Sequence, residues 1–211
     1  MTTWQRFERL WLQLGARTPG QAVFRWLVES YSQEGRAYHN LAHVSDCLDL
    51  FDRFQHLARH PAEVEIAIWF HDAVYDTRAN DNEQRSADEA LRALRRAAVP
   101  EPAPRRVSDL ILATRHQTSP AGPDAALLVD IDLSILGHAP QVFDAYERQV
   151  RAEYAWVPAD AFRQARVRLL RRFLQRESIY RTDAFRVLFE DQARRNLARS
   201  IRRLEPPHSA V

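Results

Sequence analysis

Apolar residues recur every three to four positions along most of the chain, which is the spacing of one face of an α-helix. Phe24, Leu27, Val28 and Tyr31 show the pattern clearly. It also covers residues 4–14 and 41–54, and then the stretches 61–75, 81–98, 104–117, 123–136, 140–155, 158–177 and 183–204. Alternation typical of strands in hairpins is not found. The pattern predicts an all-α protein, a single helical domain over 1–211 with about nine or ten helices.

Candidate helix ends support the same segmentation. Asn40, Asn80 and Asp183 stand where N-cap residues are expected. First-turn prolines are expected at Pro61, Pro104, Pro123, Pro140 and Pro158. The Pro-rich stretch 99–104 is too short for a domain linker and is interpreted as a connector between helices.

Composition narrows the functional classes. The 211 residues are 45% apolar and 27% charged, as in soluble globular proteins, and the net charge is only +2. All 30 basic residues are arginine, which excludes a lysine nucleophile, a Schiff base and a GxxxxGK phosphate loop. Cys47 is the single cysteine, and the five glycines form no GxGxxG string. Disulfides, multi-cysteine metal sites and a dinucleotide-binding turn are therefore not expected.

The chain also lacks the features of a membrane or exported protein. Its first residues have no apolar core with a small-residue cleavage site, and no uncharged apolar run approaches the roughly 20 residues needed to cross a bilayer. We expect a cytoplasmic protein with no membrane partner.

Polar residues interrupt the apolar pattern at four places, where function is usually found. The segments are 36–44 with His39 and His43, 69–76 with the pair His71-Asp72, 81–83, and 127–136 with Asp130 and Asp132. A single histidine on an apolar face is usually a hydrogen-bonded core residue, and an acidic residue at a helix start is usually a cap. The joint occurrence of imidazoles and carboxylates on separate helices favours instead a site for Mn, Fe, Co, Ni or Zn.

These segments resemble the HD superfamily of metal-dependent phosphohydrolases, all-helical enzymes named for an adjacent His-Asp pair. The motifs YHNLAHV, WFHDAVYD, DNEQRSA and VDIDLSILG are similar to those of a bacterial subfamily of small stand-alone predicted HD phosphohydrolases. They lie within 36–137, about half of the chain. The resemblance implies a divalent ion (Mn, Fe, Co, Ni, Zn or Mg) held by His43, His71, Asp72 and Asp130. Asp132 is the alternative ligand. We favour Asp130, because Leu133 and Leu136 would then pack beneath it.

The implied reaction is hydrolysis of a nucleotide-like or other small phosphoester or phosphoanhydride by a metal-activated water. Asp76 or Glu83 would accept or relay the proton. The stretch from His71 to Thr77 also resembles the HDxxED motif of alarmone (p)ppGpp hydrolases, with Asp76 at the second acidic position but Tyr75 at the first. Residues expected to bind the phosphorylated substrate are Arg36, His39, Arg115 and His116.

Two rival functions are considered. Some HD proteins hold two irons and oxidise a small substrate, and His39, His116 and Asp132 would be the extra ligands available here. A non-catalytic nucleic-acid or nucleotide-binding module is suggested by arginines near the C-terminus, but nucleic acid is the less favoured partner because acidic residues nearly cancel the charge. The substrate, the metal and the oligomeric state are not specified by the sequence.

Overall fold

The computed structural model describes residues 3–117 and 120–205, and within these ranges the regular structure is helical with no strand. The all-α prediction is confirmed. The chain divides into two compact units, Met1–Asp132 and Leu133–Val211, each considered by itself. The expectation of a single domain over 1–211 stays a prediction.

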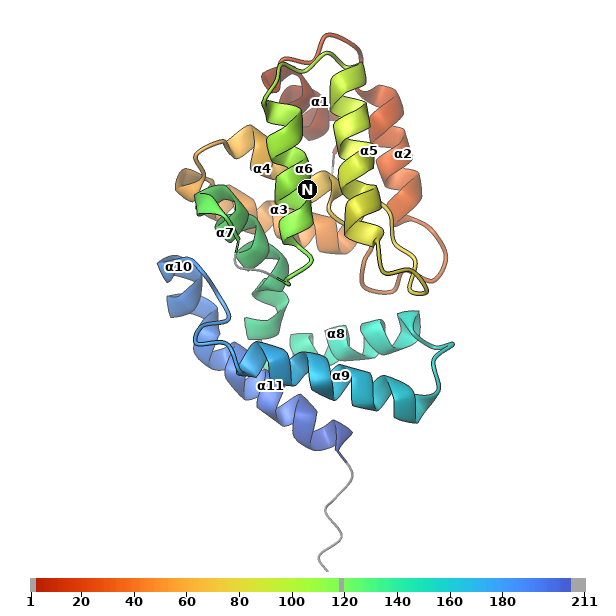
Figure 1. Cartoon of the computed structure of the whole chain (residues 1–211), viewed down its shortest axis with the longest axis vertical. Coiled ribbons are helices and arrows are strands. Elements are labelled where there is room, and N and C mark those ends of the chain that lie inside the picture. Colours follow the sequence, from red (N-terminus) through yellow and green to blue (C-terminus); the bar gives the residue numbers. More distant parts are fainter. Residues whose placement is uncertain (1–2, 118–119, 206–211) are drawn as a thin grey trace, which may run out of the picture. The chain divides into compact units, whose positions relative to one another are not determined.

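The first unit holds the helices of the N-terminal and central sequence (Figure 1). They are α1 (Trp4–Gln13), α2 (Gln21–Tyr31), α3 (Leu41–Phe54), the short 3-10 helix η1 (Gln55–Leu57), α4 (Pro61–Phe70), α5 (Asn82–Arg96), α6 (Ala103–Ala113) and α7 (Gly122–Asp132). In this unit α4 is the central helix, because it contacts α1, α3, α5, α6 and α7. Its side chains from Ile66 to Phe70 are fully buried. Figure 1 also shows α5 and α6 running side by side, in agreement with their extensive contacts.

The second unit is built from η2 (Leu133–Gly137), α8 (Pro140–Glu153), α9 (Ala159–Leu174), α10 (Asp183–Phe185), the π-helix η3 (Arg186–Glu190) and α11 (Asp191–Leu204). The last three follow one another without a break, so 183–204 is one helical run, as predicted. Buried Phe143, Leu170, Phe185 and Leu197 contribute to the core of this unit. Buried Asn196 donates from its amide to the carbonyls of Leu136 and His138, at 2.9 and 2.8 Å, which joins α11 to η2.

Of the three predicted N-caps, Asn40 is confirmed, since its side chain accepts from the N–H groups of Ala42 and His43. Asn80 and Asp183 are wrong. Helix α5 begins at Asn82, after Asp81 at the cap position, and Thr182 caps α10 by accepting from the Phe185 N–H. In both cases an adjacent polar residue takes the cap position, which composition alone does not distinguish.

Within the described ranges, no single helix is long and apolar enough to cross a membrane. One pair of helices joined by a bend, Gly122–Gly137 followed by Pro140–Glu153, is long and apolar enough for a broken membrane span by length and composition alone.

Candidate metal centre

The pair His71-Asp72 lies at the C-terminal end of α4. The helix expected over 61–75 ends at Phe70, with His71 as its C-cap. The side chain of His71 is 2% exposed and that of Asp72 is 17% exposed. The pair therefore lies between the core and solvent, where a buried imidazole can meet a ligand from outside.

Tyr31 and Arg36 hold this helix end in place. The Tyr31 hydroxyl donates to the Trp69 carbonyl at 3.1 Å and accepts from the Asp72 N–H at 3.2 Å. The Arg36 guanidinium donates to the carbonyls of Asp72 and Ala73, at 2.6 and 2.9 Å. The Trp69 carbonyl lies in the last turn of α4, where carbonyls lack partners within the helix, and the Tyr31 hydroxyl is its donor. The backbone of the His-Asp pair is thus fixed by side chains from the preceding segment.

His43 enters the site from the first turn of α3. The Asn40 side chain accepts from the N–H groups of Ala42 and His43 at 2.9 and 3.4 Å, which starts the helix at Leu41. Consequently His39 precedes the helix and does not share a helical face with His43. His39 instead stacks on Tyr75, with ring centroids 4.3 Å apart.

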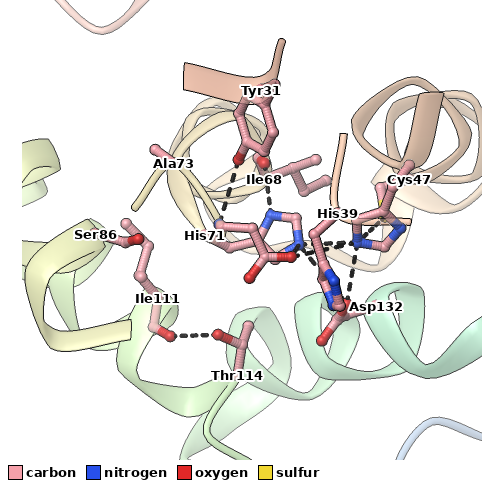
Figure 2. A network of polar contacts seen from close by, with 12 residues as sticks. Tyr31, His39, Cys47, Ile68, His71, Ala73, Ser86, Ile111, Thr114 and Asp132 are labelled. Carbon is pink, nitrogen blue, oxygen red and sulfur yellow. Dashed lines mark hydrogen bonds and ion pairs between the residues drawn. The ribbon is translucent and has the colours of Figure 1, made fainter. Parts of the chain in front are cut away.

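Imidazoles and carboxylates from three helices converge at one point (Figure 2). His43 Nε2 lies 3.1 Å from His71 Nε2, and the Asp132 Oδ1 atom lies 3.4 Å from the first and 3.7 Å from the second. Asp72 Oδ2 lies 3.1 Å from His71 Nε2 and 3.7 Å from His43 Nε2. Figure 2 shows His71 facing Asp132, with Tyr31 on the other side of His71.

The orientation of His71 is fixed by its second ring nitrogen. His71 Nδ1 lies 2.8 Å from the Ile68 carbonyl, and because a carbonyl only accepts, Nδ1 must donate. The atom left for a ligand is Nε2, which is the one that faces His43. A backbone acceptor on the far nitrogen is the arrangement commonly seen for metal-binding histidines.

Charge in this cluster favours a cation. Burial lowers the pKa of His71, but the Asp72 and Asp132 carboxylates together outweigh burial and hold that pKa well above its usual value. Burial raises the pKa of Asp72 and Asp132, yet the neighbouring imidazoles hold both pKa values below the usual range; His71 has the largest such effect on Asp72 and His116 on Asp132. Two ionised carboxylates in a mostly buried place require a positive partner.

The distances fit a bound metal ion. Ligand atoms of His43, His71 and Asp132 all lie within 4.8 Å of one another. An ion with bonds of about 2.0–2.2 Å places neighbouring ligand atoms about 2.8–3.6 Å apart, close to the separations found here. Two imidazole nitrogens with carboxylate oxygens form a donor set accepted by Zn and other first-row divalent ions. The cluster could therefore hold a metal ion.

The two carboxylates of α7 lie in different places. The sequence favours Asp130 as the ligand, whereas the structure brings the alternative, Asp132, to the histidines. Asp130 is fully buried, among the core residues of α7. Leu133 and Leu136 are buried as well, so their burial did not distinguish the two carboxylates.

The two proton-acceptor candidates lie in different surroundings. Asp76 is exposed, and its Oδ1 accepts from the Arg78 N–H at 2.9 Å, which closes a local turn. Glu83 is half-buried in the first turn of α5, one turn before Ser86. The Ser86 hydroxyl accepts from the N–H of Val74, two residues after Asp72, at 3.0 Å. Because positions i and i+3 share a helix face, Glu83 lies on the side of α5 that meets the His-Asp segment.

The residues expected to bind substrate are placed as follows. Arg36 is 9% exposed and donates to backbone carbonyls, so it supports the site. Arg115 is half-buried and donates to Gln84 Oε1 at 3.1 Å. His116 is turned toward the site, with Nε2 2.9 Å from Asp132 Oδ2.

Two residues near the site were not singled out from the sequence. Tyr31 was assigned to the apolar face of its helix, and a hydroxyl on such a face is a sign that a buried hydrogen bond must be made. Cys47 Sγ lies 3.8 Å from both ring nitrogens of His43, and its position four residues after His43 could have indicated this contact. Burial raises the pKa of the Cys47 thiol well above its usual value, which keeps it protonated.

The C-terminal arginines that suggested nucleic-acid binding are partly paired with carboxylates of the same unit. Arg171 pairs with Glu205, Arg194 with Glu190, and both Arg199 and Arg203 with Asp144.

Comparison with known proteins adds no assignment. No family model, curated protein or solved structure matches the chain. What is established is an all-α protein with a His43/His71/Asp132 cluster that could bind a metal ion.

Proposed function

We propose that the chain is a metal-dependent phosphohydrolase of the HD type, acting on a nucleotide-like or other small phosphoester or phosphoanhydride. The observation that carries the proposal is the convergence of His43, His71 and Asp132 within 4.8 Å, with Asp72 3.1 Å from His71 Nε2. The motif order that resembles HD enzymes supplies the same residues, with Asp132 in place of Asp130.

In this proposal the residues of the site have three roles: metal binding, proton transfer and contact with the substrate phosphate. His43, His71, Asp72 and Asp132 would hold the ion. Such an ion lowers the pKa of a bound water toward about 7 and stabilises negative charge on phosphoryl oxygens. Glu83, on the side of α5 that meets the His-Asp segment, is the favoured proton acceptor over Asp76, whose carboxylate is engaged in a local turn. His39 and Arg115 would contact the substrate phosphate.

The test begins with metal analysis of protein purified without chelator, followed by a screen of nucleotides and phosphoesters with that metal. We expect phosphate release that stops in chelator and in His71→Ala and Asp72→Ala. Glu83→Gln should lower turnover by about 10²–10⁴ with the metal still bound, whereas Asp76→Asn should leave turnover nearly unchanged. Release that continues at the parent rate in chelator or in Asp72→Ala would contradict the proposal.

A further inference from the structure

The two oxygens of the Asp132 carboxylate have different neighbours. Oδ1 faces the histidines, at 3.4 Å from His43 Nε2 and 3.7 Å from His71 Nε2. Oδ2 lies 2.9 Å from His116 Nε2. Because an ionised carboxylate only accepts hydrogen bonds, Nε2 of His116 must be the donor. One oxygen is therefore available for an ion while the other is held by an imidazole from the segment that follows α6.

The backbone at His116 adopts an uncommon conformation that serves this contact. Helix α6 ends with Thr114 as its C-cap, and His116 follows with φ +56°. Its N–H donates to the Ala113 carbonyl at 3.2 Å, so the turn is hydrogen-bonded. Non-glycine residues adopt left-handed φ values at a cost in free energy, and such residues gather at functional sites. Here the position carries an imidazole that reaches across to α7.

We propose that His116 is a positioning residue of the metal centre: its Nε2–H donates to Asp132 Oδ2 and thereby keeps Oδ1 turned toward His43 and His71. This proposal rests on the metal site put forward above. Asp132 is the last residue of α7, and its side chain is 17% exposed, so rotation about its side-chain bonds has room once the imidazole is removed. Hydrogen-bond partners of metal ligands typically set metal affinity by 10- to 100-fold.

The test compares three variants at one position. His116→Gln keeps a nitrogen donor at about the reach of Nε2, whereas His116→Ala removes the donor and retains a Cβ. These two residues meet the same left-handed backbone strain, so they differ mainly in the hydrogen bond. His116→Gly also removes the donor, but glycine adopts a positive φ freely, so this variant separates loss of the hydrogen bond from backbone strain.

The measurement is the binding of Co²⁺ to the full chain, as affinity, stoichiometry and visible spectrum. We expect one ion per chain in the parent and in all variants. The dissociation constant should rise about 10- to 100-fold in His116→Ala and His116→Gly, with an altered spectrum, and should stay near the parent value in His116→Gln. Rescue by glutamine in binding and spectrum is a result that a purely structural role would not produce.

Three outcomes would overturn the positioning role while leaving the metal site intact. Parent affinity in both His116→Ala and His116→Gly would show that the hydrogen bond is irrelevant, and a glutamine variant as weak as alanine would show that the donor is not the cause. A fall from two ions to one would make His116 a ligand itself. A parent chain that binds no Co²⁺, or any other divalent ion, would overturn the metal site and this proposal together.

Discussion

Asp132 is the residue of α7 whose carboxylate lies next to His43 and His71. Asp132→Asn preserves shape but removes the charge that faces His43, so the dissociation constant for Co²⁺ should rise by more than about 100-fold. Asp130→Asn, two residues earlier and buried in α7, is the matched control and should bind Co²⁺ as the parent does. Isothermal titration of both variants checks this, and the reverse order of affinities would restore Asp130 as the ligand.

The sequence could not distinguish these two carboxylates, for a physical reason. Periodicity identifies the buried face of a helix only when the other face is polar. In α7, the residues from Leu127 to Ile131 are all buried. Because every side of this stretch is buried, the pattern does not show which residues face the histidines. The same holds for the second half of α4, where Ile66 to Phe70 are all apolar and buried. The His-Asp pair stands out there because its chemistry contrasts with its surroundings, and not because of periodicity.

A second prediction concerns Arg36. Its replacement by alanine would leave the partly buried carbonyl of Asp72 and the buried carbonyl of Ala73 without this donor, so the free energy of unfolding of the metal-free protein should fall by about 2–4 kcal/mol. Arg36→Lys should recover part of this loss, because an ammonium reaches fewer acceptors than a planar guanidinium.

Urea denaturation measures the effect of Arg36. Arg9→Ala, at an exposed position of α1, provides the control and should change the free energy of unfolding by less than about 0.5 kcal/mol. Equal free energies for the Arg36→Ala and Arg9→Ala variants would be inconsistent with the role of Arg36 in holding the end of α4.

Between elements, a carboxylate of α8 links that helix to α11. Asp144 accepts from Arg199 at 2.6 Å and from Arg203 at 2.9 Å, and the hydrogen bond from Arg203 is the main cause of a lowered pKa for Asp144. A carboxyl whose pKa is lowered on folding stabilises the protein fully above its unfolded pKa of about 3.9, and this contribution is lost as pH falls through the folded pKa.

The parent and Asp144→Asn should therefore differ in free energy of unfolding by a constant amount above about pH 5. Because the Asp144 side chain is 25% exposed, we expect about 0.5–1 kcal/mol. The difference should shrink as pH falls below about 4 and should also weaken in 1 M salt. Chemical denaturation across the pH range measures it, and a difference that persists unchanged at pH 3 would argue against the charge effect.

Helices were predictable from the sequence where a local signal marks them. Helix ends were not predictable where contacts with other parts of the chain determine the last helical residue. The helical run 183–204 and the cap at Asn40 follow from pattern and composition. The end of α4 at Phe70 depends on Tyr31 and Arg36, which contact it from outside the helix. The place of His39 likewise depends on the exact start of α3, because a shift of one turn would have put it on the helix with His43.

For the whole molecule, a bound ion should stabilise the folded state by mass action. At a free Co²⁺ concentration 100 times the dissociation constant, the gain is about 2.7 kcal/mol. For a chain of this length the melting temperature should rise by about 5–10 °C. Differential scanning calorimetry with and without chelator measures this rise, and His71→Ala should show none. A similar rise in that variant would point to metal binding elsewhere on the chain.

The hydrogen bonds that hold the end of α4 also bear on the thermodynamics of ion binding. Since Tyr31 and Arg36 already fix the backbone of Asp72, and Ile68 already orients the ring of His71, little of the chain remains to be ordered when an ion arrives. Binding that buries no additional apolar surface carries a small change in heat capacity. The enthalpy of Co²⁺ binding, corrected for protons released to buffer, should therefore be nearly independent of temperature, as expected for a preformed binding site.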